Sequence, residues 1–225
     1  MKKRDLKDLL YEQVARIGKA LASPKRLELL ELLAQGEKSV EVLAQELSVD
    51  IKLASAHLKA LKEARLVGFR KEGKYVLYSL SGSDVAGLWV NLREVAEAHL
   101  QELRHALDQM VAEPSTLTTL DRPTLMARAK RGEVVVIDVR PAEEYEVGHL
   151  PYARSMPVGE IASRLAELPK GKDIVAYCRG PFCLFSQEAY QLLSRKGYRV
   201  HKLLDGVSEW QAAGMPLVGM AQAPA

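Results

Sequence analysis

The sequence predicts two domains: a mainly α-helical domain with one β-hairpin, then an α/β domain with a mainly parallel sheet. Its 225 residues exceed the common size of one domain. Up to residue 110 apolar positions recur at helical spacing, whereas after residue 122 short apolar runs alternate with helical patterns, as in βαβ units. The stretch between them has neither period and is rich in Ser, Thr and Pro. We therefore expect a first domain at 1–113, a linker at 114–121, a second domain at 122–218 and a disordered tail at 219–225.

Composition and charge exclude several classes of protein. Apolar residues make up 48% and charged residues 27%, as in globular proteins. Without an apolar run of about 18 residues, or an apolar segment after the charged start, we expect a cytoplasmic protein with no membrane partner. Two cysteines, Cys178 and Cys183, are too few for a secreted disulfide framework and favour chemistry instead. The net charge of +3 permits nucleic-acid binding without demonstrating it.

The first 64 residues predict four helices in succession. Apolar spacing indicates helices near 6–21, 24–35, 39–47 and 50–63, and Ser23, Pro24, Gly36, Ser39 and Asp50 supply start and stop signals. On the fourth helix one face is apolar, with Ala54, Leu58 and Leu61. The opposite face is polar and basic, with Lys52, Ser55, Lys59 and Lys62.

A hairpin and a long helix complete the first domain. Residues 67–78 are rich in aromatic and β-branched residues around a Glu72-Gly73 turn, which predicts a β-hairpin, and its tip carries Arg70, Lys71 and Lys74. An apolar stripe over 83–110 predicts a helix too long to remain exposed, so we expect it to pair two copies of the chain as a homodimer.

This layout is typical of a winged helix-turn-helix, whose second helix enters the major groove of double-stranded DNA. The segment from Val49 to Tyr78 contains seven basic and three acidic residues, which gives it a local charge of +4. Such a patch predicts salt-sensitive binding to a DNA operator. The alternatives are a solvated helix face, or a protein-interaction module that has lost DNA binding.

The same stretch resembles the ArsR/SmtB family of dimeric repressors over about residues 6–110. The resemblance rests on the segments at 20–27, 39–44, 56–61 and 76–78. It implies contacts to DNA from the recognition helix and from the wing, through Lys52, Ser55, His57, Lys59, Arg70, Lys71 and Lys74. Many members of the family sense metals, but residues 39–43 lack cysteine, and Ala86 stands where a further ligand would join Asp84, His99 and Glu102. We therefore expect no metal site.

The second domain places a cysteine where its thiolate is favoured. Helices are expected at 124–131, 143–146, 159–168, 185–195 and 207–213, and strands at 134–138, 174–177 and 200–204. Cys178 follows a buried strand in a tight loop that faces a helix amino terminus, and Arg179 adds a cation. The alternative, a small buried apolar residue, fits Cys183 better.

Three further segments resemble a rhodanese domain over about residues 122–218: Ile137 to Leu150, Tyr177-Cys178-Arg179, and Asp205 to Trp210. The resemblance implies that Cys178 takes sulfane sulfur from a donor such as thiosulfate or a persulfide, and needs no cofactor. It places Asp138, Arg140, Glu143 and His149 in the scaffold beside the loop. A cysteine phosphatase or arsenate reductase is disfavoured, because Leu184 stands where Cys-x5-Arg needs arginine.

Two functional hypotheses follow. In the first, the chain is a repressor that senses or transfers reactive sulfur through Cys178, with Cys183 as a resolving thiol if the two meet. In the second, it is a sulfurtransferase with a DNA-binding half that is not coupled to the sulfur chemistry.

Overall fold

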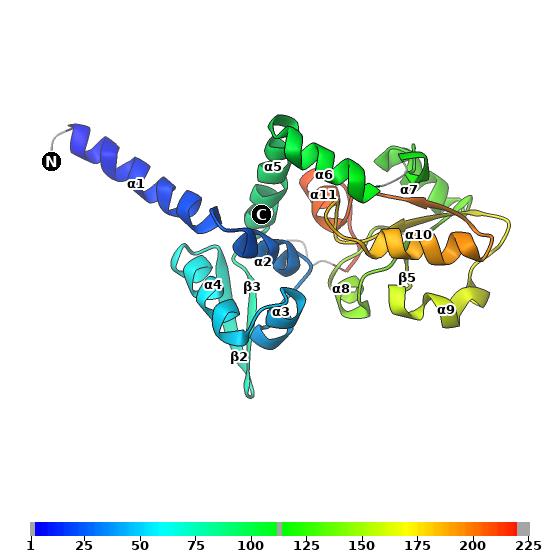
Figure 1. The fold of residues 1–225 in the computed structure, drawn as a ribbon, viewed down its shortest axis with the longest axis horizontal. Coiled ribbons are helices and arrows are strands. Elements are labelled where there is room, and N and C mark those ends of the chain that lie inside the picture. The colour runs from blue at the N-terminus through cyan, green and yellow to red at the C-terminus, as the bar shows by residue number, and fades with distance from the viewer. Residues whose placement is uncertain (1–2, 112–113, 220–225) are drawn as a thin grey trace. The chain divides into compact units, whose positions relative to one another are not determined.

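The computed structural model describes residues 3–111 and 114–219, so most of the predicted tail lies outside the described residues (Figure 1). The chain forms two compact units that divide after Trp89. This division falls inside a helix, α5 (Ser83–His99), and therefore differs from the predicted boundary at residues 113 and 114.

The first unit packs helices against a small antiparallel sheet. Its elements are α1 (Lys3–Leu21), α2 (Pro24–Ala34), β1 (Lys38–Ser39), α3 (Val40–Glu46), α4 (Ile51–Glu63), β2 (Val67–Glu72), β3 (Tyr75–Leu80) and the start of α5. The sheet has the order β1-β3-β2, and the predicted hairpin pairs Glu72 with Tyr75 around Gly73, whose φ of 58° favours glycine. The short strand β1 was not predicted, because two residues show no period. These elements confirm a winged helix-turn-helix.

Capping residues fix the two helices of the helix-turn-helix. The Ser39 hydroxyl accepts a hydrogen bond from the Val42 amide at 3.3 Å, and the Asp50 carboxylate accepts one from the Leu53 amide at 2.8 Å. The core beneath them is aliphatic, and Leu43, Leu58 and Leu61 are fully buried there.

The second unit contains a four-stranded sheet with helices on both faces (Figure 1). Its elements are the rest of α5, α6 (Gln101–Val111), α7 (Arg122–Lys130), β4 (Val134–Asp138), α8 (Ala142–Val147), β5 (Arg154–Ser155), α9 (Ile161–Arg164), β6 (Asp173–Tyr177), α10 (Phe185–Arg195), β7 (Arg199–Lys202) and α11 (Val207–Ala212). The strand order is β5-β4-β6-β7, and all three pairings are parallel, as predicted.

Alternate residues of the strands pack into two hydrophobic cores, one on each face of the sheet. Ile174, Ala176 and Cys178 point into one core, while Val175 and Tyr177 point into the other with Trp210. Parallel strands covered on both faces are continuously apolar, which explains the unbroken run in β4.

The predicted helix over 83–110 is interrupted at Leu100, where α5 ends and α6 begins. The Arg104 guanidinium donates hydrogen bonds to the carbonyl oxygens of Glu97 and Ala98, both at 3.1 Å, and thereby satisfies groups that a continuing helix would occupy. The prediction of one long dimer helix is therefore wrong in its extent.

The predicted linker also has structure of its own. Pro114–Thr116 forms a 3-10 turn, Leu117 pairs with Lys202 of β7, and the Thr118 amide donates to the Lys202 carbonyl at 2.8 Å. Likewise, the helix expected at 159–168 is divided into two 3-10 turns on either side of α9. None of the helices in the described ranges is both long and apolar enough to cross a membrane.

Candidate functional site

Cys178 lies directly after β6, in the loop that leads to α10. Its side chain is 1% exposed. The sulfur Sγ lies 3.4 Å from the Ser186 hydroxyl oxygen, 3.4 Å from the Cys183 carbonyl oxygen and 3.8 Å from the Gly180 carbonyl oxygen. The loop therefore wraps around this sulfur and brings the second cysteine to it.

The surroundings of Cys178 favour its thiolate. A hydrogen bond from the Cys183 thiol, with others from the Ser186 hydroxyl and the backbone at Gly180 and Ser186, lowers the pKa of Cys178 to about 6 despite burial. The same hydrogen bond, burial and the nearby negative charge raise the pKa of Cys183. Both cysteines are free, and the pair holds one thiolate and one thiol near neutral pH.

Arg179 forms a buried ion pair with Glu144 of α8. Its Nη2 donates to the Glu144 carboxylate at 2.7 Å and its Nε at 3.0 Å, and both side chains are buried. The guanidinium also lies 5.2 Å from the centre of the Phe185 ring. Arg179 thus ties the loop to α8, and the expectation that its charge also acts on the Cys178 thiolate stays a prediction.

The buried carboxylate of α8 is Glu144, and not the predicted scaffold residue Glu143. Glu143 is exposed and lines a cavity of about 320 Å³ together with Val158 and Phe185. The two residues are adjacent on a short helix, so the sequence could not show which one faces the loop.

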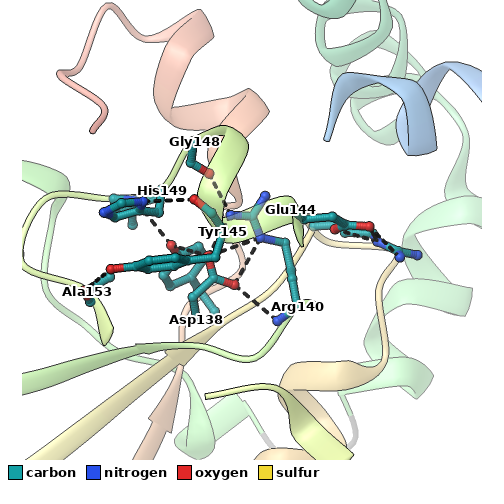
Figure 2. A network of polar contacts seen from close by, with 10 residues as sticks. Asp138, Arg140, Glu144, Tyr145, Gly148, His149 and Ala153 are labelled. Atoms are coloured by element: carbon teal, nitrogen blue, oxygen red, sulfur yellow. Dashed lines mark hydrogen bonds and ion pairs between the residues drawn. The ribbon is translucent and has the colours of Figure 1, made fainter. Parts of the chain in front are cut away.

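Asp138 and Arg140 form a fully buried ion pair at the end of β4 (Figure 2). The Arg140 guanidinium donates to Asp138 at 2.5 Å and to the Gly148 carbonyl at 2.8 Å. The Tyr177 hydroxyl donates to the same carboxylate at 2.5 Å and accepts a hydrogen bond from the Leu150 amide at 3.1 Å. This network fixes Tyr177, the residue immediately before Cys178.

His149 belongs to the same scaffold (Figure 2). Its ring stacks on Tyr145 with centroids 3.7 Å apart, and its Nδ1 lies 2.9 Å from the Tyr145 carbonyl oxygen. The Tyr145 hydroxyl donates to the Ala153 carbonyl at 3.0 Å. These hydrogen bonds of the scaffold residues Asp138, Arg140 and His149 are made with one another, with neighbouring residues and with Tyr177, and not with the sulfur of Cys178.

The candidate DNA-reading face lies on α4. Lys52, Ser55 and Lys59 are exposed, opposite the buried residues of this helix. Successive residues of a helix are about 100° apart, so His57 lies well off this face, and it is half-buried. His57 therefore departs from the surface that the other three share.

The wing carries two exposed lysines and one engaged arginine. Lys71 and Lys74 are exposed near the tip. Arg70 instead donates to Glu37 at 2.6 Å and pairs with Glu72, so two carboxylates offset its charge. On the other side of the sheet Lys62 stands 3.9 Å from the centre of the Phe69 ring and joins α4 to the wing.

Within the described residues no group of three or more His, Cys, Asp or Glu side chains is placed to hold a metal ion. Asp84 and His99 are both exposed, at opposite ends of α5.

Sequence reasoning missed several residues around the loop. Ser186 beside the sulfur, Glu144 on α8, and the pair of Arg93 and Glu209 were not predicted. Glu209 lies in the segment from Asp205 to Trp210 that carried the resemblance, but Arg93 lies 116 positions before it. No local pattern could have joined these two residues.

The sequence matches two family models, "Bacterial regulatory protein, arsR family" over residues 23–68 and "Rhodanese-like domain" over residues 121–213. The HTH-type transcriptional regulator Rv0324 of Mycobacterium tuberculosis is 44% identical, over 95% of this chain and 93% of that protein. A sulfurtransferase of Allochromatium vinosum is 35% identical over 44% of this chain and 92% of its own length. The transcriptional repressor SmtB homolog of Synechocystis is 42% identical over 40% of this chain and 66% of its own length. The chain therefore belongs to the ArsR family of bacterial regulatory proteins and carries a rhodanese-like domain after its winged helix-turn-helix domain.

Proposed function

We propose that this chain is a dimeric, cytoplasmic repressor whose affinity for DNA depends on sulfur carried by Cys178. The observation that supports this most strongly is the buried Cys178, whose sulfur lies 3.4 Å from the Ser186 hydroxyl oxygen and whose pKa is lowered by hydrogen bonds from Cys183 and Ser186. A thiolate attacks sulfane sulfur, whereas a thiol does not. The basic face of α4 supplies the DNA-binding surface.

The first step is transfer of one sulfur atom to Cys178. With thiosulfate as donor, the thiolate attacks the outer sulfur, a new S–S bond forms at Cys178, the S–S bond of thiosulfate breaks, and sulfite leaves with the electron pair. We expect the persulfide anion to accept hydrogen bonds from the same donors that lower the pKa of Cys178.

The second step involves Cys183. Its thiol loses its proton and the resulting thiolate attacks Sγ of Cys178, so that a Cys178–Cys183 disulfide forms, the bond from Sγ to the outer sulfur breaks, and the outer sulfur leaves with that proton as hydrosulfide. The two thiols are oxidised and the sulfane sulfur is reduced, so no further oxidant is needed. The closeness of Cys183 in the loop, where its carbonyl oxygen lies 3.4 Å from Cys178 Sγ, supports this resolving role.

Intact mass measurement tests this chemistry. After brief exposure of the reduced protein to polysulfide, we expect a gain of one sulfur, or a loss of two hydrogens, that is absent in Cys178→Ser. The Cys183→Ser variant should keep the added sulfur, and cyanide should remove it as thiocyanate. A wild-type mass that does not change would contradict the proposal.

A second candidate is a sulfurtransferase with an uncoupled DNA-binding half, which the similarity to the Allochromatium sulfurtransferase favours. Binding to a duplex from directly upstream of the coding sequence, with and without polysulfide, separates the two. The repressor proposal expects a sulfur-dependent affinity that Cys178→Ser abolishes. An affinity that polysulfide leaves unchanged, in a protein that turns over sulfur, supports the second candidate.

A further inference from the structure

Arg93 of α5 makes a buried ion pair with Glu209 of α11. The Arg93 side chain is 4% exposed, and its Nη1 donates to Glu209 Oε1 at 2.5 Å. Its Nε donates to Glu97 at 2.9 Å. Arg93 and Glu209 both belong to the second unit, although they are 116 residues apart in the sequence.

Glu209 in turn contacts the loop that holds Cys178. Its second oxygen accepts a hydrogen bond from the Gly206 amide at 2.7 Å. A Cβ atom built on Gly180 would lie 3.1 Å from both carboxylate oxygens. A Cβ on Gly206 would lie 2.7 Å from the Cys178 carbonyl oxygen, so here two backbones pack with only hydrogen between them.

Arg93 also contacts the loop directly. Its guanidinium carbon lies 5.9 Å from the centre of the Phe182 ring, within the range of a cation–π contact. The loop between Cys178 and Cys183 is thus held from two directions by one arginine of α5.

α5 is shared by the two units. Val85, near its start, belongs to the aliphatic core of the winged helix-turn-helix, and Arg93 follows eight residues later. Eight residues of α-helix span about 12 Å without a break. A displacement of Arg93 therefore acts on the same helix that is anchored in the DNA-binding unit.

We infer that Arg93 is a positioning residue that holds the Cys178 loop through Glu209 and transmits the chemical state of Cys178 to α5. This inference rests on the proposed function, because the contact of Arg93 would link the sulfur bound at Cys178 to the affinity of the first unit for DNA. Cys178 is fully buried, so an added atom has to displace the loop, and this loop contacts Glu209 at Gly180 and Arg93 at Phe182.

Iodoacetamide is a probe that reacts whether or not the protein handles sulfur. The Cys178 thiolate displaces iodide and forms a thioether, which Cys183 cannot reverse. In the full-length chain, we expect this adduct to increase amide hydrogen exchange in residues 86–97 by about 5-fold or more. In Arg93→Gln the same adduct should produce no further increase. Arg122→Gln is the matched control, since it removes the 2.6 Å ion pair to Asp205, beside Gly206, without touching α5.

The pH dependence of alkylation tests the positioning role itself. In Arg93→Gln the Glu209 carboxylate is left unpaired against the loop, so the midpoint for Cys178 should rise to about pH 7 or above. Arg93→Gln/Glu209→Gln removes the charge and keeps an acceptor for Gly206, so it should return the midpoint toward that of the wild type. This pair of uncharged amides also provides a folded alternative if the single variant is unstable.

Two results would overturn the inference: exchange in α5 that does not respond to the adduct in the wild type, or the same response in Arg93→Gln as in the wild type. Failure of the proposed function gives a different pattern, in which iodoacetamide changes α5 but polysulfide leaves no cyanide-labile sulfur on Cys178.

Discussion

At the scale of single residues, the chemistry of Cys178 depends on neighbours that the sequence only partly indicated. Its place after a buried strand predicted a stabilised thiolate, and Cys183 was identified as a possible partner. Ser186 could not be recognised, because a serine in the first turn of a helix is common. The pairing of Arg179 with Glu144 could not be recognised either, because the two residues lie 35 positions apart in the sequence.

Replacing Cys183 should raise the pKa of Cys178. In Cys183→Ala the strongest hydrogen bond to the thiolate is removed while burial remains, so the midpoint of iodoacetamide alkylation should move from about pH 6 to about pH 7 or above. Below its pKa the thiol dominates, so alkylation at pH 6.5 should slow more than at pH 9. Cys183→Ser, which keeps a donor, is the control. An unchanged midpoint in Cys183→Ala would show that Cys183 does not stabilise the thiolate.

The buried pair of Asp138 and Arg140 should dominate the stability of the second unit. Arg140→Gln leaves a buried carboxylate without its cation, which costs about 3 to 5 kcal/mol. Urea unfolding followed by Trp210 fluorescence, in a Trp89→Phe background, reports this unit. Arg164→Gln removes exposed ion pairs to Glu160 and Glu167 and should leave the midpoint unchanged. Equal effects of the two variants would rule out a special role for the buried pair.

At the scale of elements, local signals predicted helices, hairpin and parallel strands well. Capping residues placed the starts of α3 and α4 within two residues, because a cap and its apolar period lie in one short stretch. The strands β1 and β5 were missed because each has two residues and is defined only by a distant partner. The end of α5 at His99 was missed for a similar reason, since Arg104 reaches back to it from the next helix.

The face of α4 should determine salt-dependent binding to DNA, while Arg70 of the wing should matter less. Lys52→Ala and Lys59→Ala should each weaken binding and lower the slope of log affinity against log salt by about 1 for each phosphate that is no longer neutralised. Arg70→Ala should change the slope less, because Glu37 and Glu72 already offset its charge. Fluorescence anisotropy over a series of KCl concentrations measures these slopes, and Lys130→Ala, at the exposed end of α7, is the control. Equal slopes for all four variants would contradict this assignment.

At the scale of the whole molecule, α1 offers an apolar surface that a single chain leaves uncovered. Leu10 is 60% exposed and Val14 is 70% exposed, and with Leu6 they follow one another at four-residue spacing. The sequence predicted the dimer contact over residues 83–110, and the exposed residues of α1 add to the apolar surface available to a second copy. We therefore place part of the proposed dimer contact on α1.

A charge on this stripe should separate the dimer. Val14→Glu would bury a carboxylate in the contact while leaving the exposed position of a monomer undisturbed, so sedimentation equilibrium at micromolar concentration should show a shift toward monomer. Gln13→Glu adds the same charge one residue away and should remain dimeric. A Val14→Glu protein that sediments as the wild type does would place the contact elsewhere.

The position of Arg93 also determines which fragments of the chain retain the native surroundings of Glu209. A fragment that begins at residue 122, as sequence-based boundaries suggest, would contain Glu209 but not its cation. A carboxylate that is 4% exposed and has no guanidinium beside it takes up a proton or drives the surrounding turn apart. Sulfur-transfer rates measured on such a fragment would therefore describe a different active loop, and the shortest faithful fragment begins at Ser83, with the whole of α5.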